Sequence, residues 1–583
     1  MIAAACLRAA RLGLLLAMTC APALGAGLEY RVRIEAPEAL EKILQEGLNL
    51  VRWQNDPEMS AEQLERLIGE AVREAREAAA TEGYFSAQVE SSIDEATEPR
   101  TVLLRVEPGE RTRVAEVEIR FSGPAAQDAD ARARLAQVRS EWPLRVGMAF
   151  RQADWDAAKQ QAVRELAGWR YAAAQVAESR ALIDPDARRA VLSLEIASGP
   201  PFRFGALRVS GTRRYPEALV ANLSPVRPGD VYDRDKLLLY QRLLLETGYF
   251  ASVQAEIDAQ PQLADAAPLR VAVIEAASQQ VEAGVGYSTD AGPRVELRYG
   301  NQDVLESAWR FRSGLRLDEK IQTLQLDLDL PPREEGRWNS FFGRARRTDI
   351  QNETAQELAL GFSHNFGLQL TPSALIVSAH AEEQRVGGDI TDSRHALYFG
   401  FRRTFRRTDD FVSPRSGYFG SVELGGAPPA LASQEFMRAV GSIAFFIPLG
   451  RSGDLLLRGE AGTVIAETRL GIPTTFLFRT GGDQTVRGYA FESIGVRQGD
   501  AIVGGRRLVV GSAEYTYWIG ENWGAALFVD AGDVWDKGVQ VNPSVGYGAG
   551  VRFRTPIGPI RADLAYGEET GQYRLHFSIG YRF

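Results

Sequence analysis

The chain has 583 residues, of which 45% are hydrophobic and 25% charged, a composition typical of folded domains that excludes bulk disorder. Its 67 basic and 76 acidic residues give a formal net charge of −9, and an acidic chain is poorly suited to binding nucleic-acid phosphates. At roughly 150 residues per domain, the length predicts about four domains.

Residues 1–26 have the pattern of an export signal. Two arginines and a short apolar run precede small residues at Ala21-Pro22-Ala23, which resemble a cleavage site. A buried N-terminal helix is the alternative interpretation. The only two cysteines, Cys6 and Cys20, fall inside this segment. An exported chain without it is therefore expected to carry no disulfide, cysteine nucleophile or zinc–thiolate site.

Glycine divides the rest of the chain into two parts. Residues 281–583 contain 41 of the 56 glycines, and alternating apolar and polar residues dominate there, whereas helical periodicity stops near Ala277. No later segment approaches the ~18 consecutive apolar residues that a membrane-spanning helix needs. An exported chain of this kind is either soluble or crosses a membrane as a closed barrel.

A repeat organises the first part of the chain. Three aromatic triplets each follow a helical pattern and precede two strand-like runs: Gly83-Tyr84-Phe85, Trp169-Arg170-Tyr171 and Gly248-Tyr249-Phe250. The spacing predicts three α+β units of β-α-α-β-β order in series, at residues 27–110, 111–200 and 201–277. The triplets are expected to close the core of each unit. The pattern resembles the polypeptide-transport-associated (POTRA) domain, which implies strand edges that receive an extended client by β-augmentation.

The second part, residues 278–583, is predicted to be an all-β transmembrane barrel. Its last residues alternate strictly, with one face formed by Tyr573, Leu575, Phe577, Ile579, Tyr581 and Phe583. Such alternation suits the ~9–11 residues of a tilted spanning strand. The size of the segment fits about 16 antiparallel strands with their turns. The terminal aromatic residue also resembles the signal that delivers barrel proteins to their insertase.

A glycine-rich segment carries the most specific motif. It contains Gly481, Gly482, Asp483, Val486, Arg487, Gly488 and Tyr489, and is followed by Phe528-Val529-Asp530-Ala531-Gly532 and Gly548-Ala549-Gly550-Val551-Arg552. These elements resemble the long-loop and strand motifs of the outer-membrane barrel-insertase superfamily. The resemblance implies a loop that folds into the barrel and is pinned to its wall.

The chemistry of the motif predicts which wall residues hold the loop. Asp530 and Asp563 fall on the expected lumen face, and a guanidinium binds a carboxylate with two parallel hydrogen bonds. We therefore expect Arg487 to pair with Asp530, or with Asp563. An ordinary extracellular hairpin with a solvated arginine is the alternative.

Closure of the barrel predicts a seam between the first and last strands. Gly284, Gly286 and Gly580 leave gaps in side-chain cover there and are expected to weaken strand pairing. A weak seam would exchange its hydrogen bonds with a client strand, which avoids unpaired backbone in lipid. The alternative is that these glycines only shape the barrel.

The resemblance implies an outer-membrane assembly factor with periplasmic N-terminal domains, one barrel per chain, and β-rich clients such as autotransporters. The three units and the length favour the outer-membrane subunit of a translocation and assembly module, with a TamB-like partner anchored in the inner membrane. We find no nucleophile motif, metal-ligand spacing or cofactor motif, and expect no catalytic residues, metal or cofactor. The alternatives are a secretion pore for a dedicated exoprotein and an outer-membrane anchor for a lipid-handling partner.

Overall fold

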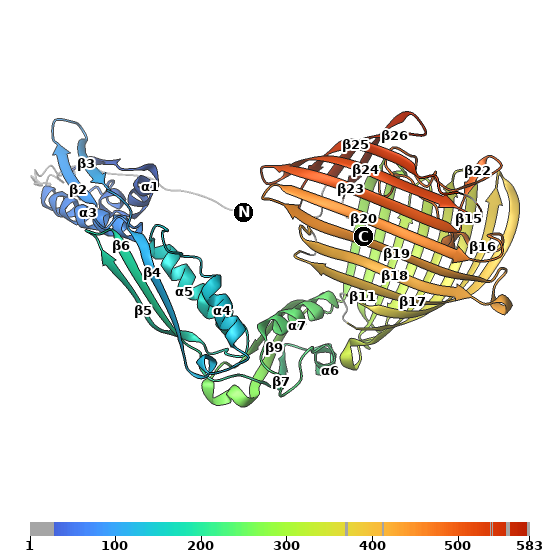
Figure 1. The fold of residues 1–583 in the computed structure, drawn as a ribbon, viewed down its shortest axis with the longest axis horizontal. Coiled ribbons are helices and arrows are strands. Elements are labelled where there is room, and N and C mark those ends of the chain that lie inside the picture. The colour runs from blue at the N-terminus through green and yellow to red at the C-terminus, as the bar shows by residue number, and fades with distance from the viewer. Residues whose placement is uncertain are drawn as a thin grey trace, which may run out of the picture. The chain divides into compact units, whose positions relative to one another are not determined.

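The structure is a computed structural model that describes residues 28–367, 371–410, 413–536, 538, 540–555 and 560–579 (Figure 1). The expected leader and the predicted seam and signal residues Gly580, Tyr581 and Phe583 lie outside the described residues. The chain divides into two compact units, the first ending at Pro201 and the second beginning at Phe202. In the part of the chain that is described, no helix has the length and apolar character needed to cross a membrane.

The first three-stranded sheet has the order β1-β3-β2, with β1 parallel to β3. Its elements are β1 (Tyr30–Glu35), α1 (Glu38–Gly47), α2 (Asn49–Arg52), α3 (Ala61–Thr81), β2 (Gln88–Asp94) and β3 (Arg100–Glu107). Helix α3 begins at a capping box, in which the Ser60 side chain accepts from Gln63 N while the Gln63 side chain accepts from Ser60 N. Its buried face consists of Leu64, Ala71, Ala75 and Ala79, as the 3.6-residue periodicity predicts.

The second sheet repeats this arrangement, with the order β4-β6-β5. Its elements are β4 (Arg113–Ser122), η1 (Pro124–Ala126), α4 (Arg132–Ser140), α5 (Gln152–Ala167), β5 (Gln175–Asp184) and β6 (Arg189–Ala197). Tyr171, from the second aromatic triplet, is buried in the core, and its hydroxyl donates to Asp128 Oδ2 at 2.6 Å. This hydrogen bond holds the pKa of the Asp128 carboxyl below its ordinary value.

The third sheet, at the start of the second unit, has the order β7-β9-β8. Its elements are β7 (Phe204–Ser210), α6 (Glu217–Ala221), α7 (Arg234–Glu246), β8 (Phe250–Ile257), η2 (Pro261–Ala266) and β9 (Ala267–Glu275). Tyr249 is buried here, and its hydroxyl donates to the carbonyl of Ala308 in the barrel at 2.6 Å. The predicted β-α-α-β-β order is thus confirmed, with one additional short helix, α2, in the first unit.

A sixteen-stranded antiparallel sheet forms the rest of the described chain (Figure 1). Its strands are β10 (Gln279–Ser288), β11 (Gly292–Val304), β12 (Trp309–Leu317), β13 (Ile321–Asp329), β14 (Trp338–Ile350), β15 (Glu353–Phe366), β16 (Ser373–Val386), β17 (Asp389–Thr408), β18 (Gly417–Ala427), β19 (Phe436–Leu449), β20 (Gly453–Ile465), β23 (Arg507–Ile519), β24 (Trp523–Trp535), β25 (Ser544–Phe553), β26 (Ile560–Gly567) and β27 (Gln572–Ile579). The predicted barrel of about 16 strands is confirmed.

The two faces of this sheet differ as the alternation predicts. Leu527, Val529 and Leu575 are exposed on the outer face, where they would meet lipid. Their neighbours Asp530 and His576 point inward and are buried. The barrel therefore has an apolar exterior and a polar interior.

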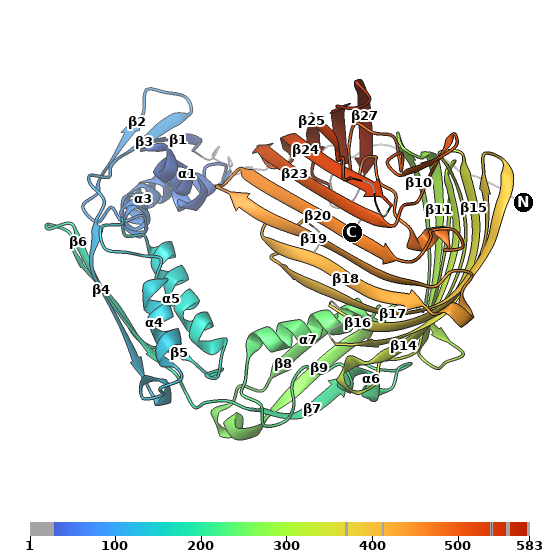
Figure 2. The same ribbon diagram turned by 45° about the vertical axis from the view of Figure 1, so that its right-hand side comes forward.

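The sheet has two edges, β10 and β27, which lie side by side (Figure 2). Among the described residues these two strands share no strand ladder. In the described residues, a hydrogen bond from Phe577 N to Thr289 Oγ1 at 3.4 Å crosses between the edges. In the described part, the seam is thus held by far fewer backbone contacts than any neighbouring strand pair.

Candidate functional site: the inward loop and the barrel seam

The segment between β20 and β23, residues 466–506, folds against the inner wall of the barrel with its central part, residues 472–494. It includes η5 (Thr474–Phe476), β21 (Val496–Gln498) and β22 (Ala501–Val503). Its apolar side chains form one buried cluster with residues of the wall: Ile472, Phe476, Phe478, Val486, Tyr489 and Ile494 from the loop, and Tyr398, Phe436, Leu508, Val510 and Val534 from the strands. Burying apolar surface in this way stabilises the inward position of the loop.

A tight turn presents the motif to the wall. Gly481 N donates to Thr485 Oγ1 at 2.9 Å, and Gly482 N donates to the carbonyl of Val486 at 3.2 Å. Gly481 and Gly482 have φ angles of +108° and +105°, a region that residues with a Cβ rarely adopt. The paired glycines are thus required by the turn that precedes Arg487.

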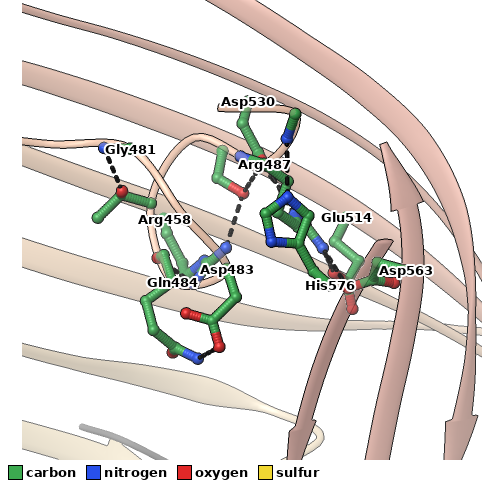
Figure 3. A network of polar contacts seen from close by, with 12 residues as sticks. Arg458, Gly481, Asp483, Gln484, Arg487, Glu514, Asp530, Asp563 and His576 are labelled. Carbon is green, nitrogen blue, oxygen red and sulfur yellow. Dashed lines mark hydrogen bonds and ion pairs between the residues drawn. The ribbon is translucent and has the colours of Figure 1, made fainter. Parts of the chain in front are cut away.

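Arg487 is fully buried against three carboxylates of the wall (Figure 3). Its Nε and Nη2 donate to the two oxygens of Asp530 at 2.6 and 2.9 Å, which is the bidentate geometry of a strong charge-assisted pair. Its backbone N also donates to Asp530, at 3.1 Å. Nη1 donates to Glu514 at 2.6 Å and to Asp563 at 3.3 Å. The structure therefore brings Arg487 together with both aspartates named from the sequence.

Arg552, on β25, completes the network. Its Nε and Nη2 donate to Glu514 at 3.0 and 2.8 Å, and its Nη1 donates to Asp563 at 2.6 Å. The guanidinium carbon of Arg487 also lies 3.4 Å from the centroid of the Phe528 ring, within range of a cation–π interaction. Two arginines thus share three buried carboxylates, so every charge in this group has an opposite partner.

Glycines of the wall make room for the loop backbone. A Cβ at Gly546 would lie 1.8 Å from the carbonyl oxygen of Arg487, and one at Gly532 would lie 2.7 Å from Val486 Cγ2. Gly488 has a φ of +93°, and a Cβ there would lie 2.8 Å from Gly567 N. The glycines of β24, β25 and β26 therefore allow the loop backbone to lie close to the wall.

A second set of contacts anchors the N-terminal part of the loop at β16 and β17. Thr474 donates through its backbone N to both oxygens of Glu382, at 3.0 Å each, and through Oγ1 at 2.6 Å. Arg394 Nη1 donates to the carbonyl of Ile472 at 2.8 Å. Glu382 and Arg394 are both buried. The loop is therefore attached to two separate parts of the wall.

Other predicted residues lie near the seam. Gly488 N donates to His576 Nε2 at 3.0 Å, and Asp483 N donates to Asp290 Oδ2 at 2.7 Å. Tyr489 donates its hydroxyl to the carbonyl of Val545 at 3.1 Å. On the first strand, a Cβ added at Gly284 would meet nothing within 4 Å, whereas one at Gly286 would lie 3.5 Å from Arg294 Nη2.

Sequence analysis missed Glu514, Asp290 and the contacts of His576. Glu514 lies on the lumen face of β23, between exposed or half-buried neighbours, and this alternation was available in the sequence. Asp290 lies in the short turn between β10 and β11, and nothing in the local pattern distinguishes it from a solvated turn residue. In the described residues no group of three or more His, Cys, Asp or Glu side chains has the arrangement of a metal site.

Comparison with known families identifies the fold. Residues 277–583, more than half of the chain, match the Omp85 superfamily domain. The chain belongs to the Omp85 superfamily. Residues 202–275 match a POTRA family described as a surface antigen variable number repeat, and residues 32–108 match the family of TamA POTRA domain 1. Omp85 proteins are membrane assembly and transport factors for unfolded outer-membrane or secreted proteins, with an outer-membrane barrel and periplasmic POTRA domains.

Similarity to individual Omp85 proteins is low. Outer envelope protein 80 of Arabidopsis thaliana chloroplasts is 31% identical over 116 residues, which are 18% of this chain and 15% of that protein. BamA from Haemophilus ducreyi lacking POTRA domains 1–3 superposes with a TM-score of 0.56 at 14% identity, over 80% of this chain and 99% of that one. CdiB from Acinetobacter baumannii gives a TM-score of 0.46 at 14% identity, over 80% and 89% of the two chains. The BamA comparison shows a common fold.

Proposed function

We propose that this protein is a TamA-type assembly factor, which takes β-rich clients such as autotransporters from the periplasm and inserts them into the outer membrane through the β10–β27 seam. The observation that carries this proposal is the pair of sheet edges, β10 and β27, which share no ladder among the described residues. An edge strand offers a row of backbone donors and acceptors to another strand.

The physical basis is exchange of strand pairing. Unpaired backbone groups cost several kcal/mol each in a hydrocarbon environment, so a spanning strand must find a partner as it enters. The side of β10 that has no ladder among the described residues supplies that partner, and the client leaves when its own strands pair with one another. Gly284 has open space where a side chain would stand, which reduces the cover of this edge.

The N-terminal sheets supply a way to receive clients. Strands β2, β5 and β8 each lie at the edge of a three-stranded sheet. An extended segment of a client, or of a TamB-like partner anchored in the inner membrane, would add a strand there by β-augmentation. The match of residues 32–108 to TamA POTRA domain 1 supports this assignment.

The loop disfavours export of an exoprotein through the lumen. Its buried cluster and its two anchors support a loop that occupies the lumen, and a chain passing through the lumen would first have to displace it. We therefore rank a secretion pore below an insertase. An anchor that only docks a partner would have no use for a weak seam.

The test is comparative outer-membrane proteomics of a deletion strain, complemented with wild-type protein or with the double variant Gly286→Cys/Gly580→Cys. Selective loss of autotransporter-like barrels, rescued by wild type and by the reduced but not the oxidised double variant, is the expected result. Loss of one secreted protein with all barrels intact would indicate a secretion pore. Normal barrels with a lost periplasmic partner would indicate an anchor.

The last strand is also proposed to carry the protein's own targeting signal. Tyr573 and Leu575 are exposed on the outer face, as a lipid-facing strand requires. Deletion of Phe583 is expected to lower the amount of folded protein in the membrane, measured by the unboiled gel mobility of membrane fractions. An unchanged amount of folded protein would contradict this role.

A further inference from the structure

Asp290 lies where three parts of the barrel meet. It belongs to the turn between β10 and β11, and its side chain is buried. Its Oδ2 accepts from Asp483 N of the inward loop at 2.7 Å, and its Oδ1 lies 3.5 Å from His576 Nδ1 of the last strand. The Asp290 carboxylate thus contacts the last strand, across the seam, and also the inward loop.

His576 makes the corresponding contacts from the other side of the seam. It is buried on the inner face of β27, directly opposite Asp563 of β26. Its Nε2 accepts from Gly488 N at 3.0 Å, so the proton of the neutral ring lies on Nδ1, which faces Asp290. The His576 ring therefore lies between Gly488 of the loop and Asp290 of the turn between β10 and β11.

The geometry leaves Asp290 dependent on this histidine. Among the described residues His576 is the one basic side chain within 4 Å of the Asp290 carboxylate. The loop fits closely here as well, because a Cβ at Gly482 would lie 2.5 Å from Asp290 Oδ2. A buried carboxylate without a hydrogen bond or a nearby basic group is costly, so Asp483 N and the His576 ring both stabilise Asp290 in this position.

We propose that Asp290 and His576 are positioning residues that couple release of the inward loop to opening of the seam. Movement of β27 away from β10 separates His576 from Asp290 and pulls the acceptor of Gly488 N away from the loop. Conversely, release of the loop removes a partner from each of the two residues. The inference rests on the proposed function, since it assumes that the seam opens during client insertion.

Coupling of this kind is reciprocal. If a closed seam favours the locked loop by a given factor, a locked loop favours the closed seam by the same factor. The wall network at Arg487 does not provide this coupling by itself, because Asp530, Glu514 and Asp563 all lie on strands β23–β26, away from the β10 edge. Asp290 and His576 lie at the two edges, and each of them also contacts the loop.

The experiment compares loop release with the seam locked and unlocked. Thr289→Cys and Phe577→Cys, whose parent residues are in contact across the seam, are joined by a short thiol crosslinker in protein without the leader cysteines. Loop release is measured as the rate of trypsin cleavage after Arg487, which is fully buried while the loop is locked. Fragments are identified by mass spectrometry.

The crosslink is expected to slow this cleavage by at least about fivefold in the parent protein, the lower end of typical coupling between two sites. In the variant carrying Asp290→Asn and His576→Leu, the crosslinked and uncrosslinked rates should agree within about twofold. When His576→Gln takes the place of His576→Leu, an acceptor for Gly488 N is retained. Part of the difference between the crosslinked and uncrosslinked cleavage rates should then return. Equal slowing in the parent and in the double variant would overturn the proposal.

A matched control separates coupling from general damage. Glu296 also lies near the seam, on β11, where it pairs with Arg294 and Arg298 at 3.4 and 3.0 Å. Glu296→Gln should leave the effect of the crosslink unchanged. Each variant must show the folded mobility on unboiled gels; if the double variant does not fold, the comparison is made with Asp290→Asn alone, for which the same loss of coupling is expected.

Client insertion into liposomes distinguishes this inference from the proposed function. If the parent protein inserts clients and the coupling is absent, the positioning role is wrong and the insertase stands. If the parent protein inserts no client whereas the crosslink still slows cleavage, the seam is coupled to the loop and the proposed function is wrong.

Discussion

The wall at β24–β26 and the seam edge at β10 both contain glycines in alternating strands, but the glycines act differently. At the wall, Gly546 lies against the loop backbone, with space for no additional atom. At the seam, a side chain at Gly284 would meet nothing. The same residue type therefore permits close packing in one region and leaves an uncovered edge in the other.

The polar contacts of the two regions differ in the same way. Arg487 makes a bidentate pair and two further ion pairs at the wall, all within 3.3 Å. At the seam, Asp290 and His576 are 3.5 Å apart. One side of the barrel therefore holds the loop with several short polar contacts, whereas the ion pair at the seam is longer.

Removal of the Arg487 side chain is expected to have the largest effect. Arg487→Ala leaves buried carboxylates at Asp530 and Glu514 short of a partner, and breaking a buried ion pair in this way costs about 3–5 kcal/mol. The midpoint temperature of the gel-mobility shift in detergent should fall strongly. Arg487→Lys should restore only part of the lost midpoint temperature, because an ammonium group cannot form the bidentate pair.

The exposed Arg497 provides the control for this prediction. Arg497→Ala removes the same charge from the hairpin β21–β22 and should leave the midpoint nearly unchanged. Equal midpoints for the two alanine variants would mean that the wall network does not hold the loop.

Gly546→Ala is the next largest change. The new Cβ would lie 1.8 Å from the carbonyl oxygen of Arg487, so the loop must move, and overpacking of this kind costs about 1–3 kcal/mol. We expect faster trypsin cleavage after Arg487. The control is Gly511→Ala on β23, where a Cβ meets nothing within 4 Å. Trypsin should cleave this variant at the rate of the parent protein. Equal acceleration by both substitutions would show that the effect is not local.

The sequence predicted much of this arrangement, and the parts that it did not predict have a common cause. The two faces of each strand follow from local periodicity, which a single strand carries in itself, the three α+β units follow from a repeat, and the number of about 16 strands follows from the size of the segment. The contact of Arg487 with Asp530 was predicted because the motif resembles an inward loop and a guanidinium binds a carboxylate with two parallel hydrogen bonds.

Asp290 could not be predicted in the same way. Its partners Asp483 and His576 are 193 and 286 residues away in the chain, and only closure of the barrel brings them together. Glu382 is similar, since a buried glutamate on β16 gives no local sign that it accepts hydrogen bonds from Thr474. Residues that hold loops inside a barrel are determined by tertiary contacts.

Glu382→Gln tests the second anchor of the loop and should have an intermediate effect. The amide keeps one acceptor oxygen for Thr474 but loses the charge, and hydrogen bonds to charged groups contribute about 1.5–3 kcal/mol each. The midpoint temperature should fall less than for Arg487→Ala. Glu383→Gln, at the half-buried neighbouring position on the same strand, is the control and should have little effect. A fall as large as that for Arg487→Ala would mean that the loop is held equally at both parts of the wall.

Gly284→Ala should have the smallest effect, and in the opposite direction from Gly546→Ala. The added methyl group meets nothing, and replacing glycine within a strand removes backbone freedom from the unfolded chain, which stabilises by about 0.5–1 kcal/mol. A less flexible β10 edge should slow client insertion into liposomes about twofold, because the edge must adapt to each incoming strand. Gly314→Ala on β12 also meets nothing within 4 Å, but both sides of that strand are paired, so insertion should proceed at the parent rate. Equal insertion rates for the two variants would mean that the flexibility of β10 has no part in admitting a client.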